Sequence, residues 1–139
     1  MAPISTVLEV GQPEERWVPV TLPCGHKGFI QAGEGEIKQA PFKRPRLSPD
    51  QMVAQAKRFL GLPYLWGGTS PLGIDCSGFA QLIYRLSGIE ILRDAGIQYT
   101  SSGLMEIPKG QEKAGDLIFF GGKSITHVGM MISDHEFIH

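Results

Sequence analysis

The sequence has few cysteines, no long hydrophobic run and no excess of charge of either sign. Two cysteines in 139 residues are too few for a disulfide-stapled small protein or a four-cysteine zinc site. No apolar stretch approaches the length of a membrane-spanning helix, and the first residues lack the basic start and apolar core of a signal peptide. Thirteen Lys and Arg against fourteen Asp and Glu give a net charge of −1. That balance provides no basic surface for nucleic acid or for an anionic membrane.

Glycine and proline are plentiful, and residues 1–40 contain no helical pattern. Three short apolar runs, at 6–10, 17–22 and 27–30, are separated by turn residues and predict short strands. Three such strands are too few for a stable β-domain alone. Residues 41–47 combine proline with basic residues, show no periodicity, and are interpreted as a linker.

Residues 48–139 begin with a strong helix-start signal. Ser48 suits the N-cap, Pro49 suits the first helical position, and Gln51 completes a capping box. Gly61 is expected to end this helix. The apolar residues that follow the cap recur at helical spacing and predict its buried face: Met52, Val53, Ala56, Phe59 and Leu60.

A second helix is predicted to begin near Cys76 and to stop at Ser87-Gly88. Its buried stripe comprises Phe79, Leu82, Ile83 and Leu86. A polar, glycine-containing stretch follows, and then three runs at 116–120, 127–132 and 136–139 predict strands joined by turns. Helices first and an antiparallel meander afterwards indicate an α+β fold.

Cys76 is the residue best placed for chemistry, because it lies in the first turn of the second predicted helix. Unpaired backbone amides and the positive end of the helix dipole favour a thiolate there, which is the form that attacks a carbonyl. A backbone amide at the same helix start could stabilise the developing oxyanion. The alternative interpretations are structural: a buried cysteine, with Asp75 as a plain N-cap.

Two of the four histidines are placed to assist this cysteine. His127 begins one predicted strand and His139 lies on the next, so the two can become cross-strand neighbours. One imidazole could then accept the proton of Cys76 while the other orients it. His26 and His135, in predicted turns, are interpreted as ordinary polar residues.

Four segments together resemble the NlpC/P60 family of cell-wall peptidases: residues 62–68, Asp75-Cys76-Ser77-Gly78-Phe79, residues 115–120 and His127-Val128-Gly129-Met130. The resemblance covers about residues 48–139. It implies a papain-like cysteine peptidase with helices packed on an antiparallel sheet, no cofactor, and a peptidoglycan-derived peptide as its partner. By this resemblance Cys76 is the nucleophile, His127 is the base, and His139 takes the third position that orients the base.

The resemblance also implies residues that contact the substrate. Tyr64 matches a tyrosine that lines the site near the nucleophile. Asp75 and Ser77 flank the cysteine, where relatives contact the free amine of the substrate. Arg93-Asp94 and Gln98 match a recurring segment for which a mainly structural role is expected.

Residues 1–40 resemble the later half of a bacterial SH3-like (SH3b) domain, through Trp17-Val18-Pro19-Val20, a turn, and Gly28-Phe29-Ile30. SH3b modules before an NlpC/P60 domain are similar to the γ-D-glutamyl-L-diamino acid endopeptidases. Those enzymes hydrolyse the bond between D-Glu and the diamino acid, and their SH3b domain helps to select a free N-terminal L-Ala. The first half of the SH3b pattern is missing, which leaves this selection open. The catalytic domain is also expected to be truncated after His139.

Three alternatives follow from the same residues. The first is a cell-wall peptide-binding protein, in which an SH3b-type recognition fragment is attached to an inactive papain-like domain. The second is a zinc protein that uses Cys24, His26 and some of the other histidines, although the Cys-Gly-His spacing is too tight for usual ligand pairs. The third is a disulfide between Cys24 and Cys76, which would silence the nucleophile. Location stays open between cytoplasmic recycling of muropeptides and secretion to the cell wall, and so do the diamino acid and the oligomeric state.

Overall fold

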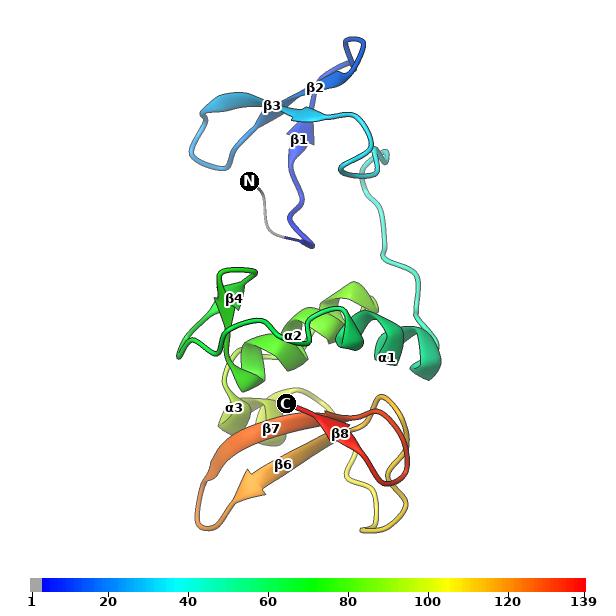
Figure 1. The fold of residues 1–139 in the computed structure, drawn as a ribbon, viewed down its shortest axis with the longest axis vertical. Helices are drawn as coiled ribbons and strands as arrows, with labels where there is room; N and C mark the ends of the chain where they lie inside the picture. The colour runs from blue at the N-terminus through cyan, green and yellow to red at the C-terminus, as the bar shows by residue number, and fades with distance from the viewer. Residues whose placement is uncertain (1–3) are drawn as a thin grey trace. The chain divides into compact units, whose positions relative to one another are not determined.

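The computed structural model describes residues 4–139, which divide into two compact units (Figure 1). We call residues 6–43 the N-terminal unit, and residues 44–139 together with 4 and 5 the C-terminal unit. The boundary after Lys43 lies inside the 41–47 stretch. The first three residues of the expected 1–40 segment lie outside the described residues.

The N-terminal unit is a three-stranded antiparallel sheet with strand order β1-β2-β3. Its strands are β1 (Glu9–Val10), β2 (Trp17–Thr21) and β3 (Lys27–Gln31), so each predicted run contains a strand, although the first is shorter than predicted. Because side chains alternate along a strand, Val18 and Val20 of β2 point to one face, where both are buried. They are the buried apolar side chains of this unit.

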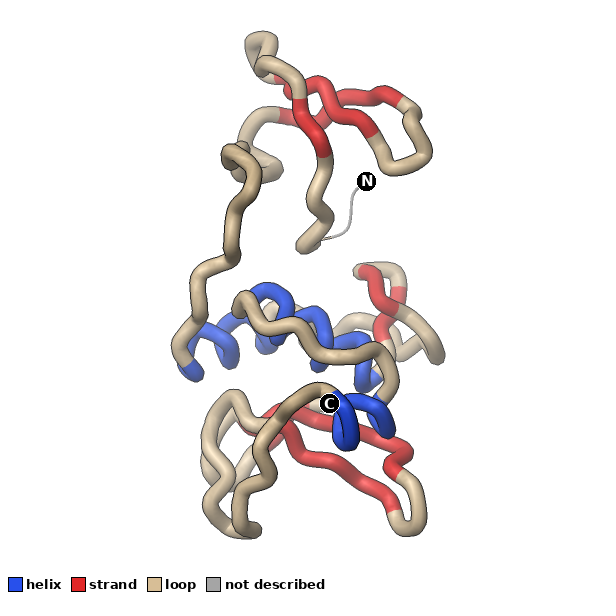
Figure 2. Tube along the Cα trace, turned by 180° about the vertical axis from the view of Figure 1, so that it is seen from behind, coloured by secondary structure: helices blue, strands red, loops and turns tan. Residues whose placement is uncertain are grey.

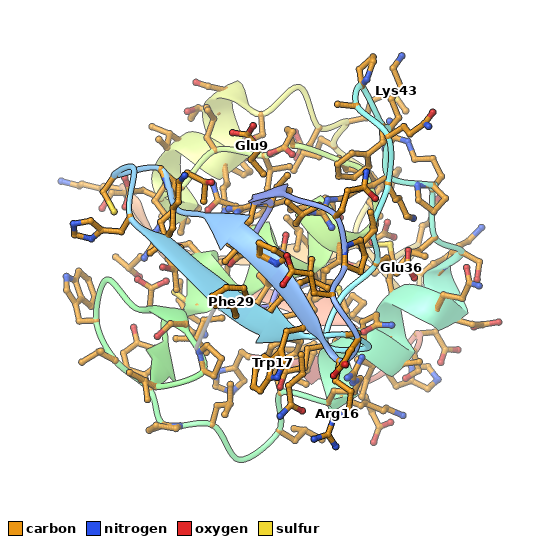
Figure 3. All side chains as sticks on the ribbon, turned by 90° about the horizontal axis from the view of Figure 1, so that it is seen from above. Glu9, Arg16, Trp17, Phe29, Glu36 and Lys43 are labelled. Atoms are coloured by element: carbon orange, nitrogen blue, oxygen red, sulfur yellow. The ribbon has the colours of Figure 1, made fainter. Side chains whose placement is uncertain are left out.

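The opposite face of the same sheet carries exposed aromatic side chains (Figure 3). Trp17 is 45% exposed and Phe29 is 63% exposed. With Glu14 and Glu15 they line an open depression of about 530 Å³. The N-terminal unit therefore buries few apolar residues and presents its largest ones outward.

The C-terminal unit begins with α1 (Pro49–Lys57), and its capping box is present as predicted. The Gln51 amide donates to Ser48 Oγ at 3.3 Å, and the Ser48 amide donates to Gln51 Oε1 at 2.9 Å. Met52 and Ala56 are buried, but Leu60 is 66% exposed. Its predicted burial is wrong because the helix ends at Lys57, so Leu60 no longer follows the helical face.

The central element of this unit is α2 (Cys76–Leu86), which packs against α1, α3 (Ala95–Ser101) and β7 (Ile125–Met131). Phe79, Leu82 and Ile83 are buried, as predicted for its stripe, while Leu86 is only partly buried. Tyr84 donates a hydrogen bond to the carbonyl oxygen of Gly115 at 2.8 Å, and burial raises the pKa of this tyrosine to about 12. The helix α3 falls within residues 94–103, where no element was predicted.

The strands β6 (Leu117–Gly121), β7 and β8 (Phe137–Ile138) form the predicted antiparallel meander. Strand β7 begins two residues earlier than predicted, so His127 is its third residue and not its first. Figures 1 and 2 show α1 and α2 as a layer over this sheet. A short hairpin, β4 (Thr69–Ser70) and β5 (Gly73–Ile74), precedes α2. The C-terminal unit thus has the predicted α+β fold.

Within residues 4–139, every helix is too short or too polar to cross a bilayer.

Candidate active site

The first residue of α2 is Cys76, which is 8% exposed. The helix begins there because Asp75 has an extended backbone and caps it, with its carboxylate accepting a hydrogen bond from the Gly78 amide at 2.6 Å. The first amides of a helix have no partner within the helix. The thiol therefore lies among backbone donors at the positive end of the helix dipole.

The carboxylate of Asp75 connects three segments of the chain. Its Oδ1 accepts from the Gly78 amide and from Arg93 Nη1 at 3.0 Å, and its Oδ2 accepts from the Gly67 amide at 2.9 Å and from Arg93 Nη2 at 2.7 Å. Burial alone would raise the pKa of Asp75. The hydrogen bonds from Arg93, Gly78 and Gly67, with the charge of Arg93, outweigh burial and hold this pKa below its ordinary value.

Ser77, on the other side of the cysteine, has partners in the segment that leads into α3. Its hydroxyl accepts from Arg93 Nη1 at 2.9 Å and lies 3.4 Å from Asp75 Oδ1, to which it can donate. Gln98 is fully buried, and its Nε2 donates to the carbonyl oxygens of Ser77 and Leu92, each at 2.9 Å. Both residues that flank the cysteine are therefore held by a segment more than fifteen residues away in the chain.

Tyr64 lies beside the cysteine on the loop before β4. Its pKa is raised first by desolvation, then by the charges of Cys76 and Asp75 and by a hydrogen bond with Cys76. The side chain is otherwise accessible, since Tyr64 is 59% exposed. Backbone hydrogen bonds hold this loop to Ile74: the Leu65 amide donates to Ile74 O at 3.2 Å, and the Ile74 amide donates to Pro63 O at 3.1 Å.

The structure also brings His127 and His139 together, as their predicted places on neighbouring strands indicated. Their Nε2 and Nδ1 atoms lie 3.0 Å apart, and the two rings are nearly perpendicular at 89°. This bond leaves Nδ1 of His127 for another partner. Burial, and to a smaller extent the charge of His139, lowers the pKa of His127 below its ordinary value.

Aromatic rings and a glycine support the histidine pair. Phe120 lies opposite His127 in the register of β6 and β7, and Phe137 stacks near His139 with ring centroids 5.4 Å apart. A Cβ added at Gly129 would lie 2.8 Å from the Phe137 ring and 3.4 Å from His139 Cβ. Sequence reasoning did not assign these three residues to the site. The signal was available, because residues two apart on a strand share a face.

The two parts of the site belong to one packed core. Cys76 and Val128, the neighbour of His127, lie in the same buried cluster, and α2 packs directly on β7.

Both Cys24 and Cys76 are free thiols. Among residues 4–139, no three His, Cys, Asp or Glu side chains are grouped in a way that could hold a metal ion. His135 is exposed and pairs with Asp134 at 3.3 Å.

Residues 61–139, which include the whole stretch from Tyr64 to His139, match the model of the NlpC/P60 family. The chain belongs to this family. Its predicted family and fold class are thereby confirmed, whereas the SH3b-like assignment of residues 1–40 stays a prediction.

Named relatives of this NlpC/P60 chain include two bacillus enzymes. It is 41% identical over 124 residues to a γ-D-glutamyl-L-lysine dipeptidyl-peptidase of Bacillus cereus, which covers 86% of this chain and 37% of the relative. It is 38% identical over 114 residues to the enzyme of the same name from Bacillus subtilis, covering 77% of this chain and 38% of the relative. The chain thus spans well under half the length of these relatives.

Solved structures show the same fold. The crystal structure of an NlpC/P60 family protein from Bacillus cereus has a TM-score of 0.85 and 37% identity, covering 99% of this chain and 46% of that one. The NlpC/P60 domain of the peptidoglycan hydrolase SagA has a TM-score of 0.61 and 35% identity, covering 67% of this chain and 80% of that one. The matched parts of both structures therefore share the fold of this chain.

Proposed function

We propose that this protein is a cysteine peptidase that hydrolyses the γ-D-glutamyl–diamino acid bond of bacterial cell-wall peptides. The observation that carries the proposal is the His127–His139 hydrogen bond of 3.0 Å. An imidazole whose Nε2 is held by a second imidazole has a fixed ring orientation and a free Nδ1, which suits a general base. The thiol at the start of α2 supplies the matching nucleophile in the same packed core.

The proposed reaction proceeds through a thioester. The thiolate of Cys76 attacks the γ-carbonyl carbon of D-Glu, and backbone amides at the start of α2 stabilise the oxyanion. The C–N bond then breaks, and His127 gives the leaving amine the proton that it took from the Cys76 thiol when the thiolate formed. Water attacks the thioester, His127 accepts the water's proton, and the carboxylate product leaves as the thiol sulfur is released. His139 keeps the ring of His127 oriented through both steps.

The substrate class rests on similarity. Two relatives with 41% and 38% identity are named γ-D-glutamyl-L-lysine dipeptidyl-peptidases. Tyr64, beside the thiol and half exposed, is proposed to line the substrate site. Asp75 and Ser77 are proposed to lie next to the substrate's N-terminal end, where a free amine would be recognised.

The test uses a defined L-Ala-γ-D-Glu-diamino acid tripeptide, with lysine or diaminopimelate, and mass spectrometry of the products. Cys76→Ala is expected to abolish cleavage, while Cys24→Ala, which removes the other thiol, is expected to leave it unchanged. Cleavage by Cys76→Ala at the parent rate would refute the proposal. A parent protein that binds the tripeptide without cleaving it, and whose Cys76 resists a thiol probe, would instead favour the binding-protein alternative.

The same assay with a blocked L-Ala amine tests recognition at the N-terminal end. Slower cleavage of the blocked peptide, together with a raised KM in Ser77→Ala, would support the proposed contact. Equal cleavage of free and blocked peptides would remove free-amine selection from the proposal while leaving the chemistry of Cys76 intact.

A further inference from the structure

We infer that Arg93 is a positioning residue for Cys76, and that its cation keeps the neighbouring Asp75 carboxylate from opposing the thiolate. Arg93 was expected from the sequence to be mainly structural, and the geometry assigns it this additional electrostatic role. The inference rests on the proposed function of Cys76 as the nucleophile.

The guanidinium group of Arg93 binds both residues that flank the cysteine. Its Nη1 donates to Asp75 Oδ1 at 3.0 Å and to Ser77 Oγ at 2.9 Å. Its Nη2 donates to Asp75 Oδ2 at 2.7 Å and reaches Gly68 O at 3.4 Å. A planar fork with several fixed donors can make this set of contacts, whereas the single ammonium group of lysine cannot.

The pieces that Arg93 joins are packed too closely to rearrange freely. The Asp75 amide donates to Gly68 O at 3.1 Å, so the loop that carries Tyr64 is bonded directly to the start of α2. A Cβ at Gly78 would lie 2.5 Å from Gly68 O. Loop and helix therefore meet without space for a side chain, and the buried Asp75 carboxylate between them needs the bonds that Arg93 provides.

Three charged or titratable groups interact with Cys76 or precede it directly in the chain: Tyr64 from the loop before β4, Asp75 from the helix cap, and Arg93 from the segment before α3. The strand that carries His127, β7, packs on the same helix. Arg93 interacts electrostatically with Cys76, Asp75 and Asp94. Its positive charge favours a thiolate, and it also neutralises the adjacent carboxylate, whose negative charge would disfavour one.

A second contact from the same segment restrains the same residue. Gln98, five residues after Arg93, donates to the backbone oxygen of Ser77 at 2.9 Å and is fully buried. The segment from Arg93 to Gln98 thus holds Ser77 by both its side chain and its main chain. This contact fixes position, while Arg93 adds charge, so the two can be separated by experiment.

The experiment measures the alkylation of Cys76 by iodoacetamide as a function of pH, in the 139-residue chain carrying Cys24→Ser so that one thiol reacts. We expect Arg93→Met to raise the pH midpoint of alkylation by about one unit, and so to slow the reaction by up to about tenfold at pH values below the parent's midpoint. Arg58→Met removes an equal charge from an exposed position at the end of α1 and is expected to leave the midpoint unchanged.

Two further variants separate charge from geometry. Arg93→Lys keeps the charge but not the fork, so its midpoint should stay near that of the parent while tripeptide cleavage falls. Asp75→Asn combined with Arg93→Met removes the uncompensated carboxylate and should return the midpoint toward that of the parent. This double variant and Arg93→Lys keep the test informative if Arg93→Met does not fold, which a thermal melt would reveal.

The outcomes also separate this inference from the proposed function. An unchanged midpoint in folded Arg93→Met, or a midpoint in the double variant as high as that in Arg93→Met, would overturn the role of Arg93. A midpoint in Arg93→Lys as high as in Arg93→Met would overturn the charge argument as well. Alkylation requires no substrate, so these results stand whether or not Cys76→Ala loses cleavage, which is the test of the nucleophile itself.

Discussion

The two units of this chain bury very different amounts of apolar surface. In residues 6–43 the buried apolar side chains are Val18 and Val20, and the larger Trp17 and Phe29 are exposed. In the C-terminal unit a cluster of fourteen buried residues extends from α1 through α2 to β7 and β8. Hydrophobic burial is the main stabilising contribution in folding, so the C-terminal unit has far more support for rigid structure.

This difference in buried apolar surface determines which unit can hold catalytic groups in fixed positions. The residues proposed for catalysis lie on or directly beside elements anchored in the larger cluster: Cys76 begins α2, His127 lies on β7, and His139 directly follows β8. Reacting groups need to be held within a fraction of an ångström, which packed helices and strands achieve better than loosely supported ones. The N-terminal unit instead presents exposed aromatic residues, which suits contact with other molecules more than catalysis.

The largest expected effects come from replacing one buried apolar side chain by alanine in each of the two units. Ile83→Ala, at a fully buried position of α2, should lower the free energy of unfolding of the C-terminal unit by about 2–5 kcal/mol. Val18→Ala should cost about 1–2 kcal/mol, because it removes fewer atoms from a smaller core. Amide hydrogen exchange, read separately for α2 and β2, measures both. A loss for Val18→Ala as large as that for Ile83→Ala would contradict the difference in core size.

The second test concerns the strand pair that carries the histidines. Gly129→Ala should destabilise the C-terminal unit by about 1–3 kcal/mol and reduce tripeptide cleavage, because the added Cβ would meet the Phe137 ring at 2.8 Å and Ile138 O at 3.1 Å. Gly122→Ala is the matched control, since a Cβ there has no atom within 4 Å. Thermal melts and cleavage rates of both variants check this. Equal melting temperatures and cleavage rates in the two variants would show that β7 and β8 accommodate the added Cβ at Gly129.

The third test concerns the first turn of the C-terminal unit. Ser48→Ala removes the cap of α1 and should cost about 1 kcal/mol, whereas Ser48→Asp can still cap and should cost less. Urea unfolding followed by circular dichroism at the helical band measures the loss, because all three helices in the described residues lie in this unit. If Ser48→Ala left the free energy of unfolding unchanged, packing alone would be sufficient to stabilise α1.

The smallest expected effect is that of pH. Because burial, and then His139, lowers the pKa of His127 below 6.5, the unfolded chain binds a proton here more readily than the folded one. This group therefore makes stability fall as pH drops through 6.5 toward the lower folded-state value. Titration of the His127 ring by NMR should find that lowered pKa, and His139→Gln should raise it part of the way back. A value at or above 6.5 in the parent protein would contradict this.

Much of the fold could be predicted because local signals were strong. The Ser48 capping box and the apolar stripe of α2 depend on residues three or four apart, and the meander depends on alternating runs. The helix α3 was missed because its signals are not local. Its N-cap Asp94 makes no side-chain cap hydrogen bond, and the helix is held by tertiary contacts such as the Tyr99–Phe119 ring pair at 5.4 Å.

The candidate site likewise contains some contacts that local sequence patterns predict and others that they do not. The meeting of His127 and His139 could be predicted from their places on neighbouring strands. The pairing of Arg93 with Asp75 could not, because eighteen residues separate them and no periodicity connects them. The close contact at Gly129 depends on how the Phe137 ring turns, which a residue pattern does not specify.

The hydrogen bond between the two imidazoles also limits how many protons the pair can hold. Between Nε2 of His127 and Nδ1 of His139, 3.0 Å apart, there is space for one hydrogen. With one positive charge shared by the two rings, the bond persists, and either ring can carry the charge. A second charge would place N–H against N–H, and the rings would have to separate. The pair therefore holds at most one positive charge while its hydrogen bond is intact. Protonation of both rings would break this bond and with it the alignment of His127.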